Sequence, residues 1–340
     1  MPASDAPPAA AIFGCAGPVL NAAERAFFAR VRPLGFILFA RNIETPDQVR
    51  ALVAELRASV GRADAPVLID QEGGRVQRLR PPHWRKAPPG AAFAALAGRD
   101  KAAALEAVRL NFRLIGRELA DLGIDVDCAP VLDVPVPGAH DVIGDRAYGL
   151  DPAQVAELGR ACCDGLLDEG VLPVVKHIPG HGRAMVDSHL ALPVVEAGRA
   201  ELEAADFPPF RALADQPWGM TAHVVYKAID ADRPATTSAR VIGEVIRGLI
   251  GFQGFLVSDD LSMKALGGSF EDRTRAALDA GCDAVLHCNG EMAEMEAVAA
   301  AMTPLDGIAE ERLARAAKMK RVPQALDVAD VSARIDGMLA

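Results

Sequence analysis

Eight apolar, strand-like segments recur along the chain, and each is followed by a segment rich in Ala, Leu, Glu and Arg that is typical of a helix. The strand-like segments span residues 11–16, 35–40, 66–70, 124–134, 172–177, 218–225, 254–259 and 283–288. The helical segments lie near residues 21–31, 46–60, 101–122, 152–169, 199–214, 239–250, 271–281 and 291–302. Such alternation favours a parallel sheet whose faces are covered by helices.

Eightfold alternation without a break in composition predicts an α/β fold, namely a single (β/α)8 TIM-type barrel over residues 11–304. A doubly wound parallel sheet is the alternative architecture. Residues 1–10 are expected to form an N-terminal tail, and residues 305–340 a C-terminal helical extension that packs on the barrel. Two helix starts support these boundaries, because Thr45-Pro46-Asp47 and Asp151-Pro152 each place proline at a first helical position.

Composition argues against several classes of function. The 340 residues carry a formal net charge of −10, which does not suit a surface for nucleic acid or for an anionic membrane. No apolar run approaches the roughly 18 residues of a membrane span. The six cysteines have no Cys-x-x-Cys spacing, so we expect buried, reduced thiols in a cytoplasmic protein. No Lys or Arg precedes Cys15, and Pro7-Pro8 interrupts the short apolar stretch, so we expect no signal peptide.

A dense polar segment follows the apolar run at residues 171–175. It contains Lys176-His-Ile-Pro-Gly-His-Gly182 and Asp187-Ser-His189, which place three histidines, a lysine and an aspartate close together. The proline and glycines of the first motif oppose a helix, so the segment is predicted to be a shaped loop after the fifth strand. In a parallel barrel, catalysis takes place at this C-terminal end of the strands.

Polar residues also gather where two other predicted strands end. The third strand runs into Asp70-Gln-Glu-Gly-Gly-Arg-Val-Gln-Arg78, in which Asp70 and Arg78 are candidates to hydrogen-bond a polar substrate. The seventh strand ends in Ser258-Asp-Asp-Leu-Ser-Met263. There, one aspartate can cap the next helix while the other faces the barrel mouth as a candidate nucleophile.

Two further residues admit two interpretations each. Arg146, after the fourth strand, is either a surface arginine paired with Asp145 or a clamp that reaches into the barrel mouth. His223, at the end of the sixth strand, is either a core residue with satisfied hydrogen bonds or a ligand. The sequence does not decide between these interpretations.

The polar segment supports two competing kinds of chemistry. Asp187 precedes His189 by two residues, a spacing at which a bent loop lets the carboxylate hydrogen-bond the imidazole and favour its charged form. Such an imidazole is a candidate general acid. The spacing of His177 and His181 is instead typical of zinc ligands, but it aligns two ligands only on a helix, which the local proline and glycines oppose. We therefore expect no metal.

Four motifs together resemble the β-N-acetylglucosaminidases of glycoside hydrolase family 3, and in particular the single-domain bacterial enzymes of peptidoglycan recycling. The motifs lie at residues 70–78, 176–182, 187–189 and 258–263, and the similarity runs in order from about residue 12 to 300. The chain departs from the family pattern in having Ile178 in place of a frequent phenylalanine. It also has alanine where serine is common after the arginine at 146.

The resemblance implies a retaining exo-β-N-acetylglucosaminidase that hydrolyses the β-1,4 bond between N-acetylglucosamine and N-acetylmuramic or 1,6-anhydro-N-acetylmuramic acid. It implies that Asp259 is the nucleophile and that His189, partnered by Asp187, is the general acid and then the general base. Larger relatives take the acid from a second domain. We expect no second domain here, so the loop at 180–190 must supply the acid. The implied substrate-binding residues are Asp70, Arg78, Arg146, Lys176 and His177.

The implied enzyme uses no cofactor. We expect a monomer that acts on a muropeptide or another N-acetylglucosamine glycoside and that binds neither nucleic acid nor membrane. Three alternatives remain open at this point. They are a metal-dependent barrel hydrolase built on the histidines, a sugar-binding barrel without turnover, and a phosphorylase that uses the same nucleophile with phosphate as the acceptor.

Overall fold

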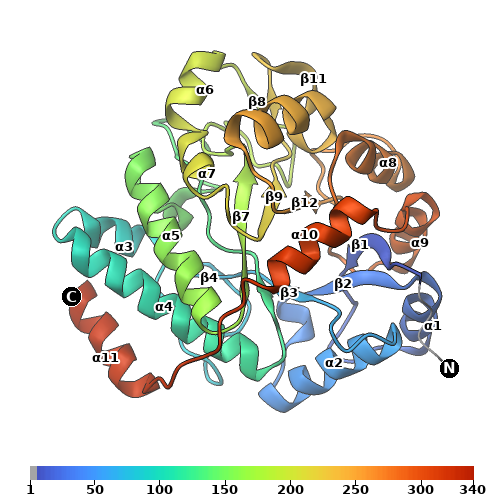
Figure 1. The fold of residues 1–340 in the computed structure, drawn as a ribbon, viewed down its shortest axis with the longest axis horizontal. Coiled ribbons are helices and arrows are strands. Elements are labelled where there is room, and N and C mark those ends of the chain that lie inside the picture. The colour runs from blue at the N-terminus through green and yellow to red at the C-terminus, as the bar shows by residue number, and fades with distance from the viewer. Residues whose placement is uncertain (1–5) are drawn as a thin grey trace.

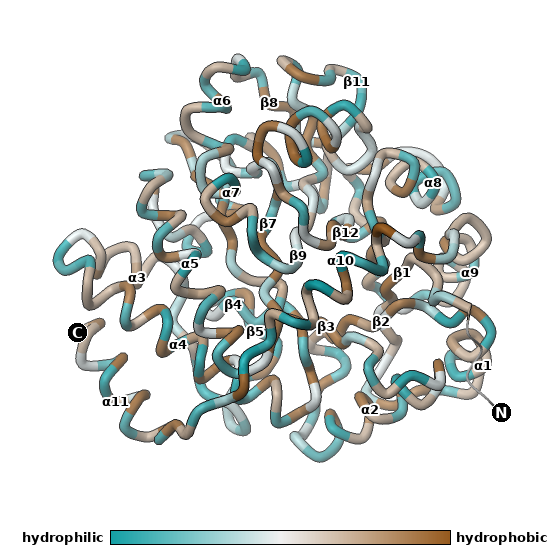
Figure 2. The backbone as a smooth tube through the Cα atoms, in the orientation of Figure 1, coloured by the Kyte–Doolittle hydropathy of each residue, from teal (hydrophilic) through white to brown (hydrophobic). Residues whose placement is uncertain are grey.

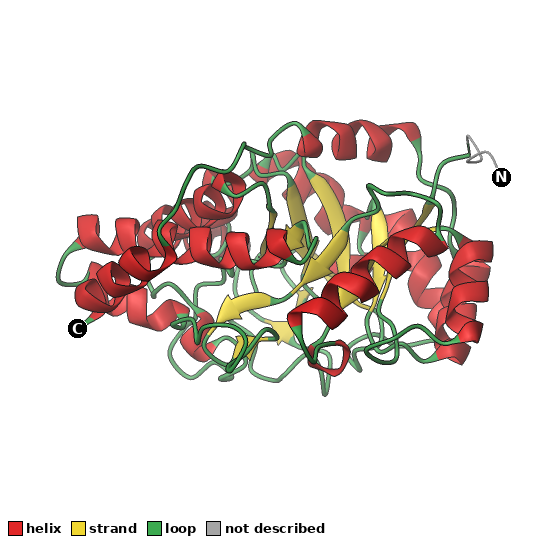
Figure 3. Cartoon of the chain, turned by 90° about the horizontal axis from the view of Figure 1, so that it is seen from below, coloured by secondary structure: helices red, strands yellow, loops and turns green. Residues whose placement is uncertain are grey.

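A computed structural model describes residues 6–340, and its eight parallel strands close into a barrel inside a shell of helices (Figure 1, Figure 3). Around the barrel the order is β1–β13–β12–β9–β7–β6–β3–β2. The strands are β1 (Ala9–Phe13), β2 (Pro33–Leu38), β3 (Val67–Ile69), β6 (Val126–Asp127), β7 (Leu172–Ile178), β9 (Trp218–Thr221), β12 (Phe255–Asp260) and β13 (Ala284–His287). Because β1 pairs with both β2 and β13, the sheet is closed. The predicted (β/α)8 barrel is confirmed, and the doubly wound sheet is excluded.

Helices surround the barrel and return the chain to the start of each next strand. They are α1 (Ala22–Val31), α2 (Pro46–Ser59), α3 (Gly90–Ala97), α4 (Lys101–Asp121), α5 (Pro152–Asp168), α6 (Arg199–Ala205), α7 (Pro208–Ala212), the π-helical η4 (Val241–Ile250), α8 (Phe270–Ala280) and α9 (Met292–Ala301). Both predicted helix starts are present, and a side chain caps each of them. Thr45 accepts the N–H of Gln48 at the start of α2, and Asp151 accepts the N–H of Ala153 at the start of α5.

Two predicted elements differ from the structure because of proline. The strand predicted at 124–134 is regular only in β6, and the chain then follows β7 through isolated bonds such as the one from Leu132 N–H to the carbonyl of Lys176 at 2.7 Å. Pro130 has no N–H with which to extend the ladder. The helix predicted at 199–214 is split into α6 and α7 next to Pro208-Pro209.

Several short elements in the connections were not predicted. Besides helix α3 they are the hairpin β4 (Gln71–Gly73) and β5 (Val76–Gln77), the small sheet β8 (Val194–Val195), β10 (Val225–Tyr226) and β11 (Asp230–Pro234), and the turns η1 (Ala40–Asn42), η2 (Gly144–Arg146) and η3 (Ala235–Thr237). The hairpin matters for function, because it carries the polar motif at residues 70–78, which follows β3.

The core consists of the barrel interior and the layer between strands and helices. Apolar side chains such as Ile12, Leu34, Val174 and Trp218 fill the interior and exclude water from the barrel axis. Figure 2 shows the hydrophobic residues of β1 against hydrophilic stretches on peripheral helices such as α8. All six cysteines are buried and unpaired, as predicted. No helix among residues 6–340 is both long and apolar enough to cross a membrane.

The C-terminal segment contributes α10 (Gly307–Ala317) and α11 (Val328–Leu339). Helix α10 crosses the barrel (Figure 1), and Leu305 and Ala309 join the interior apolar cluster at the N-terminal ends of the strands. Helix α11 packs on α4, where Val331 and Ile335 contact Leu114. Helix α10 therefore covers the end of the barrel opposite the polar motifs, whereas α11 lies on the outer layer of helices.

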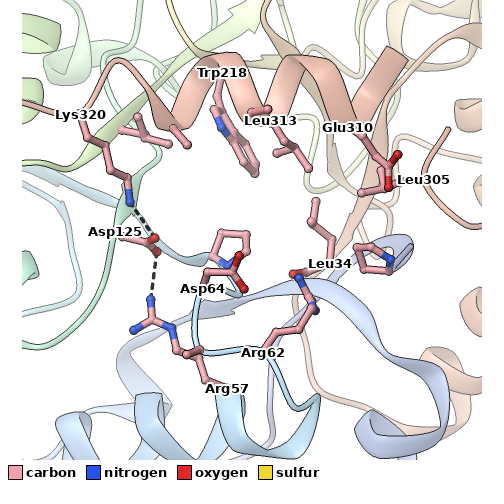
Figure 4. A pocket seen from close by; sticks show the side chains of 16 residues that line it. Leu34, Arg57, Arg62, Asp64, Asp125, Trp218, Leu305, Glu310, Leu313 and Lys320 are labelled. Carbon is pink, nitrogen blue, oxygen red and sulfur yellow. Dashed lines mark hydrogen bonds and ion pairs between the residues drawn. The ribbon is translucent and has the colours of Figure 1, made fainter. Parts of the chain in front are cut away.

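A cavity of about 470 Å³ lies between α10 and the N-terminal ends of the strands (Figure 4). Asp125 accepts from Lys320 at 2.9 Å and lies 3.4 Å from Arg57, so these ion pairs tie the segment after α10 to the barrel base. Arg62 donates to the carbonyls of Pro33 and Leu34. These cations are thus engaged in structural contacts, and the candidate catalytic residues lie at the other end of the barrel.

Candidate active site

The residues that the sequence singles out converge on the C-terminal mouth of the barrel. A pocket of about 140 Å³ opens there between the ends of β3, β7 and β12. Its lining includes Asp70, Arg78, Arg146, Lys176, His177, His189 and Asp259. The eighth predicted residue, Asp187, contacts His189. Segments that are far apart in the chain thus supply one concave, polar site.

Five charged side chains form one network, which we call the charged cluster. Lys176 Nζ lies 2.8 Å from Asp70 Oδ1 and 2.7 Å from Glu72 Oε1. Arg146 donates from Nε and Nη2 to the two carboxylate oxygens of Glu72 at 2.9 and 2.8 Å. Arg78 Nη2 donates to Asp70 Oδ2 at 3.1 Å. Arg146 is therefore a clamp in the mouth, and the surface pairing with Asp145 is wrong.

Mutual charge keeps this cluster ionised although Lys176 and Glu72 are buried and the other members are partly buried. Burial alone would raise the pKa of the Asp70 carboxyl, but Lys176 and Arg78 hold that pKa well below its usual range. The same balance, with Arg146 as the main cation, lowers the pKa of Glu72 to about 2. The cluster thus presents fixed cationic donors and anionic acceptors, which suits recognition of the hydroxyl and amide groups of a sugar.

His177 is oriented by a carboxylate that the sequence analysis did not single out. Its Nδ1 lies 2.7 Å from Oδ2 of Asp133, which is completely buried. Because a carboxylate only accepts, Nδ1 carries the proton, and the other nitrogen, Nε2, makes no hydrogen bond to Asp133. Asp133 Oδ1 also accepts the backbone N–H groups of His177 at 3.2 Å and of His181 at 2.6 Å. One carboxylate therefore orders the whole turn after β7.

The two adjacent aspartates of β12 have different partners. Asp260 accepts the N–H groups of Ser262 at 3.0 Å and of Cys288 at 3.1 Å, so it caps the turn after the strand. The expected helix does not start there, because α8 begins only at Phe270. Asp259 lines the pocket, and its side chain accepts the N–H of Asp260 at 2.8 Å. The oxygen Oδ2 of Asp259 has no hydrogen-bond partner among the described residues.

The environment of Asp259 favours the carboxylate form. Burial would raise the pKa of this carboxyl, but His223, His177 and the N–H of Asp260 together lower the pKa below its ordinary value. Asp259 is therefore an ionised carboxylate at neutral pH, and it lies half-buried in the pocket. Such a group can act as a nucleophile toward an electrophilic carbon that enters the pocket.

Asp187 and His189 form the expected carboxylate–imidazole pair. His189 Nδ1 lies 2.8 Å from Asp187 Oδ1, which also accepts the N–H of His189 at 2.9 Å. Burial acts to raise the pKa of the Asp187 carboxyl, but the hydrogen bonds from His189 outweigh this effect and bring the pKa below its ordinary value. The carboxyl is therefore ionised at neutral pH. The imidazole side chain is 64% exposed, and Nε2 is free to face a bound molecule at the rim of the pocket.

His223 does not extend the site. His223 is completely buried, with Nδ1 at 2.7 Å from Thr236 Oγ1 and Nε2 at 3.0 Å from the carbonyl of Asp260. It is a core residue with satisfied hydrogen bonds, which decides between its two interpretations. Within residues 6–340, no three His, Cys, Asp or Glu side chains lie close enough together to hold a metal ion.

Two side chains in contact with the predicted site residues, Glu72 and Asp133, were not predicted from the sequence. Glu72 lies within the polar motif at residues 70–78, but only Asp70 and Arg78 of that motif were predicted to contact a substrate. Asp133 interrupts the apolar run Val131-Leu132-Asp133-Val134, and an acidic residue inside a buried strand-like run is itself a signal for a charged partner. That partner is His177, 44 residues further along the chain.

Comparison with known proteins places this geometry in a family. Residues 20–324 match the family model described as the Glycosyl hydrolase family 3 N terminal domain. The chain belongs to glycosyl hydrolase family 3. It is therefore a glycoside hydrolase, and the resemblance inferred from the four motifs is confirmed.

Named relatives agree with this assignment. The β-hexosaminidase of Alkalilimnicola ehrlichii is 43% identical over 311 residues, which cover 89% of this chain and 87% of that protein. The β-hexosaminidase of Methylococcus capsulatus is 42% identical over 282 residues, which cover 82% of this chain and 82% of that protein. The crystal structure of NagZ from Neisseria gonorrhoeae in complex with N-trifluoroacetyl-D-glucosamine superposes with a TM-score of 0.86, at 31% identity and 98% coverage of both chains.

Proposed function

We propose that this family 3 hydrolase is a retaining exo-β-N-acetylglucosaminidase in which Asp259 is the nucleophile and His189, paired with Asp187, is the acid and then the base. The observation that carries the proposal is the shared pocket, where the ionised Asp259 carboxylate and the His189 imidazole both line the space next to the charged cluster. A nucleophile and a separate proton donor around one pocket are the minimum for double displacement.

In the first step, Asp259 Oδ2 attacks the anomeric carbon and forms a glycosyl ester. The bond to the leaving oxygen breaks with its electron pair, and that oxygen takes the proton from His189 Nε2. In the second step, Nε2 accepts a proton from water, the water oxygen bonds to the anomeric carbon, and the ester bond to Asp259 breaks. The Asp187 carboxylate stabilises the charged imidazole before the first step and again after the second.

The charged cluster and His177 would bind the N-acetylglucosamine in the terminal subsite, with Asp70, Arg78, Arg146, Lys176 and His177 as the contacts. The relative that was crystallised with an N-acylated glucosamine supports this assignment. We propose that the natural substrate is N-acetylglucosamine β-1,4-linked to N-acetylmuramic or 1,6-anhydro-N-acetylmuramic acid, with or without a stem peptide. Its hydrolysis would serve peptidoglycan recycling in the cytoplasm.

Double displacement predicts that the product keeps the β configuration. The protein should release N-acetylglucosamine from the 1,6-anhydro-muramyl disaccharide, and proton NMR recorded before mutarotation should show the β-anomer first. First release of the α-anomer would contradict the mechanism. Binding of the disaccharide without any release would instead favour a sugar-binding barrel, and release as a sugar 1-phosphate on addition of phosphate would favour a phosphorylase.

Chelation tests the alternative of a metal-dependent hydrolase. The proposed nucleophile and acid need no metal, so activity should be unchanged after exhaustive dialysis against a chelator, with residual zinc measured by atomic emission. Loss of activity that added zinc restores would contradict the proposal and favour a catalytic metal on the histidines. Dialysis without the chelator is the control for slow inactivation.

A further inference from the structure

Ser188 lies between the two members of the acid pair, yet it is buried while its surroundings are exposed. Its exposed fraction is 3%, whereas Met185, Val186, His189 and Leu190 are all exposed on the same loop. A buried residue between exposed neighbours is a point at which the loop is attached to the rest of the protein. The contacts of Ser188 therefore determine where the neighbouring catalytic side chains lie.

Two bonds attach Ser188 to the body of the barrel. Its hydroxyl oxygen lies 3.0 Å from Nε2 of His181, and its carbonyl accepts the N–H of Ala265 at 3.2 Å. The first bond is made by side chains and the second by backbone alone. A substitution at the hydroxyl therefore removes one attachment and leaves the other in place.

His181 is a rigid anchor for the hydroxyl. It is 3% exposed, its N–H is held by Asp133 at 2.6 Å, and its ring lies edge-on to that of His177 with centroids 5.7 Å apart. Burial and the neighbouring His177 lower the pKa of His181 to about 4. His181 is thus a neutral imidazole over the pH range in which a histidine acid works, and the anchor does not change charge during turnover.

We propose that His181 and Ser188 form a latch that positions Asp187 and His189 over the pocket. Asp133 serves both sides of the site, because it orients His177 toward the sugar and fixes the backbone of the latch histidine. His181 and Ser188 are positioning residues, since neither lines the pocket. The inference rests on the proposed role of His189 as the acid.

The latch matters because a general acid acts only within hydrogen-bond reach of the leaving oxygen. The His189 side chain is held at one nitrogen by Asp187, which is itself part of the same loop. The pair therefore moves with this part of the loop, and the ring of His181, at the buried start of the same loop, bonds the Ser188 side chain within the motif Asp187-Ser-His189. Releasing this bond should misplace the acid without altering the charged cluster or the nucleophile.

Substitutions at the hydroxyl test the latch with a matched control. Ser188→Ala removes the hydroxyl and keeps the bond to Ala265, whereas Ser188→Thr keeps the hydroxyl. With a disaccharide substrate, Ser188→Ala should lower kcat by roughly 10- to 100-fold, the order expected for a misplaced catalytic group. With a nitrophenyl glycoside, whose leaving group needs little protonation, the loss should be small. Inhibition by N-acetylglucosamine should be unchanged, and Ser188→Thr should recover most of the rate.

The histidine side of the latch is tested in the same way. His181→Leu should reproduce the leaving-group-dependent loss, His181→Gln should recover part of it, and Ser188→Ala with His181→Leu should be no worse than either single variant. Losses that are equal for both substrates, or that multiply in the double variant, would overturn the latch.

His189→Ala, measured in parallel, separates the latch from the proposed function. If His189→Ala shows the leaving-group dependence and Ser188→Ala does not, the latch is wrong and the proposed acid stands. If His189→Ala shows no such dependence, the proposed acid is wrong and the latch is overturned with it.

Discussion

Replacing Asp259 with alanine or asparagine should lower kcat by roughly 10⁴- to 10⁶-fold, the range seen when a covalent enzyme loses its nucleophile. The expected loss follows from the position of this carboxylate, which lines the pocket in its ionised form and has one oxygen free to attack. Asn keeps the shape of the side chain and can still accept the N–H of Asp260, so the fold should be retained. Steady-state kinetics and thermal unfolding of both variants measure the two effects separately.

Azide provides a positive test on the same variant. In Asp259→Ala, the space left by the carboxylate can admit a small anion, and azide should restore turnover of a nitrophenyl glycoside. The product should be the α-glycosyl azide, because a single displacement inverts the anomeric carbon. Turnover of the alanine variant within about tenfold of the unaltered protein would contradict Asp259 as the nucleophile. Asp260→Ala is not a matched control, because Asp260 caps the turn after β12.

The second large effect is expected at the acid pair. Asp187→Ala and His189→Ala should each lower kcat on a disaccharide by roughly 10²- to 10⁴-fold, the usual contribution of general acid–base assistance. The double variant should be little worse than His189→Ala, because both changes disable the same proton transfer between Nε2 and the leaving oxygen. Nitrophenyl glycosides should show a smaller defect in the glycosylation step, since their leaving groups depart without a proton.

Multiplicative losses in the double variant would contradict the pair, because they would indicate two independent contributions. Equal defects on disaccharide and nitrophenyl substrates would count against His189 as the acid. There is one exception, in which hydrolysis of the glycosyl ester limits the overall rate and conceals a defect in the first step. Pre-steady-state kinetics identifies this case. A burst of nitrophenol in His189→Ala would show that this exception applies.

The barrel itself was predictable because strand and helix alternate with different hydrophobic periods, which depend only on neighbouring residues. The deviations arose where proline acts, at Pro130 in the fourth strand and at Pro208-Pro209 in the sixth helical segment. Proline removes a backbone donor, so its effect depends on which partner strand or turn would have accepted the bond. That partner is set by tertiary packing and is not visible in a local pattern.

The candidate site was predictable to the level of residues but not of partners. The motifs identified Asp70 and Lys176, yet their contact spans 106 positions in the chain, and no local signal indicates it. Glu72 and Asp133 were missed because a buried carboxylate acquires its role from the cation or imidazole it meets. The apolar run around Asp133 signals a charged partner but does not identify it. His223 is the opposite case. The sequence left it as either a core residue or a ligand, and hydrogen bonds to Thr236 and to the carbonyl of Asp260 show that it is a core residue.

The central claim is that the reaction passes through a covalent bond to Asp259. The most direct measurement uses a 5-fluoro N-acetylglucosaminyl fluoride, whose fluorine slows both steps and whose good leaving group lets the intermediate accumulate. After trypsin digestion, mass spectrometry should find one added sugar on the peptide of residues 248–264, and fragmentation should place it on Asp259 and not on Asp260. A sugar attached to any other residue, or turnover of the reagent with no labelled protein, would contradict the account.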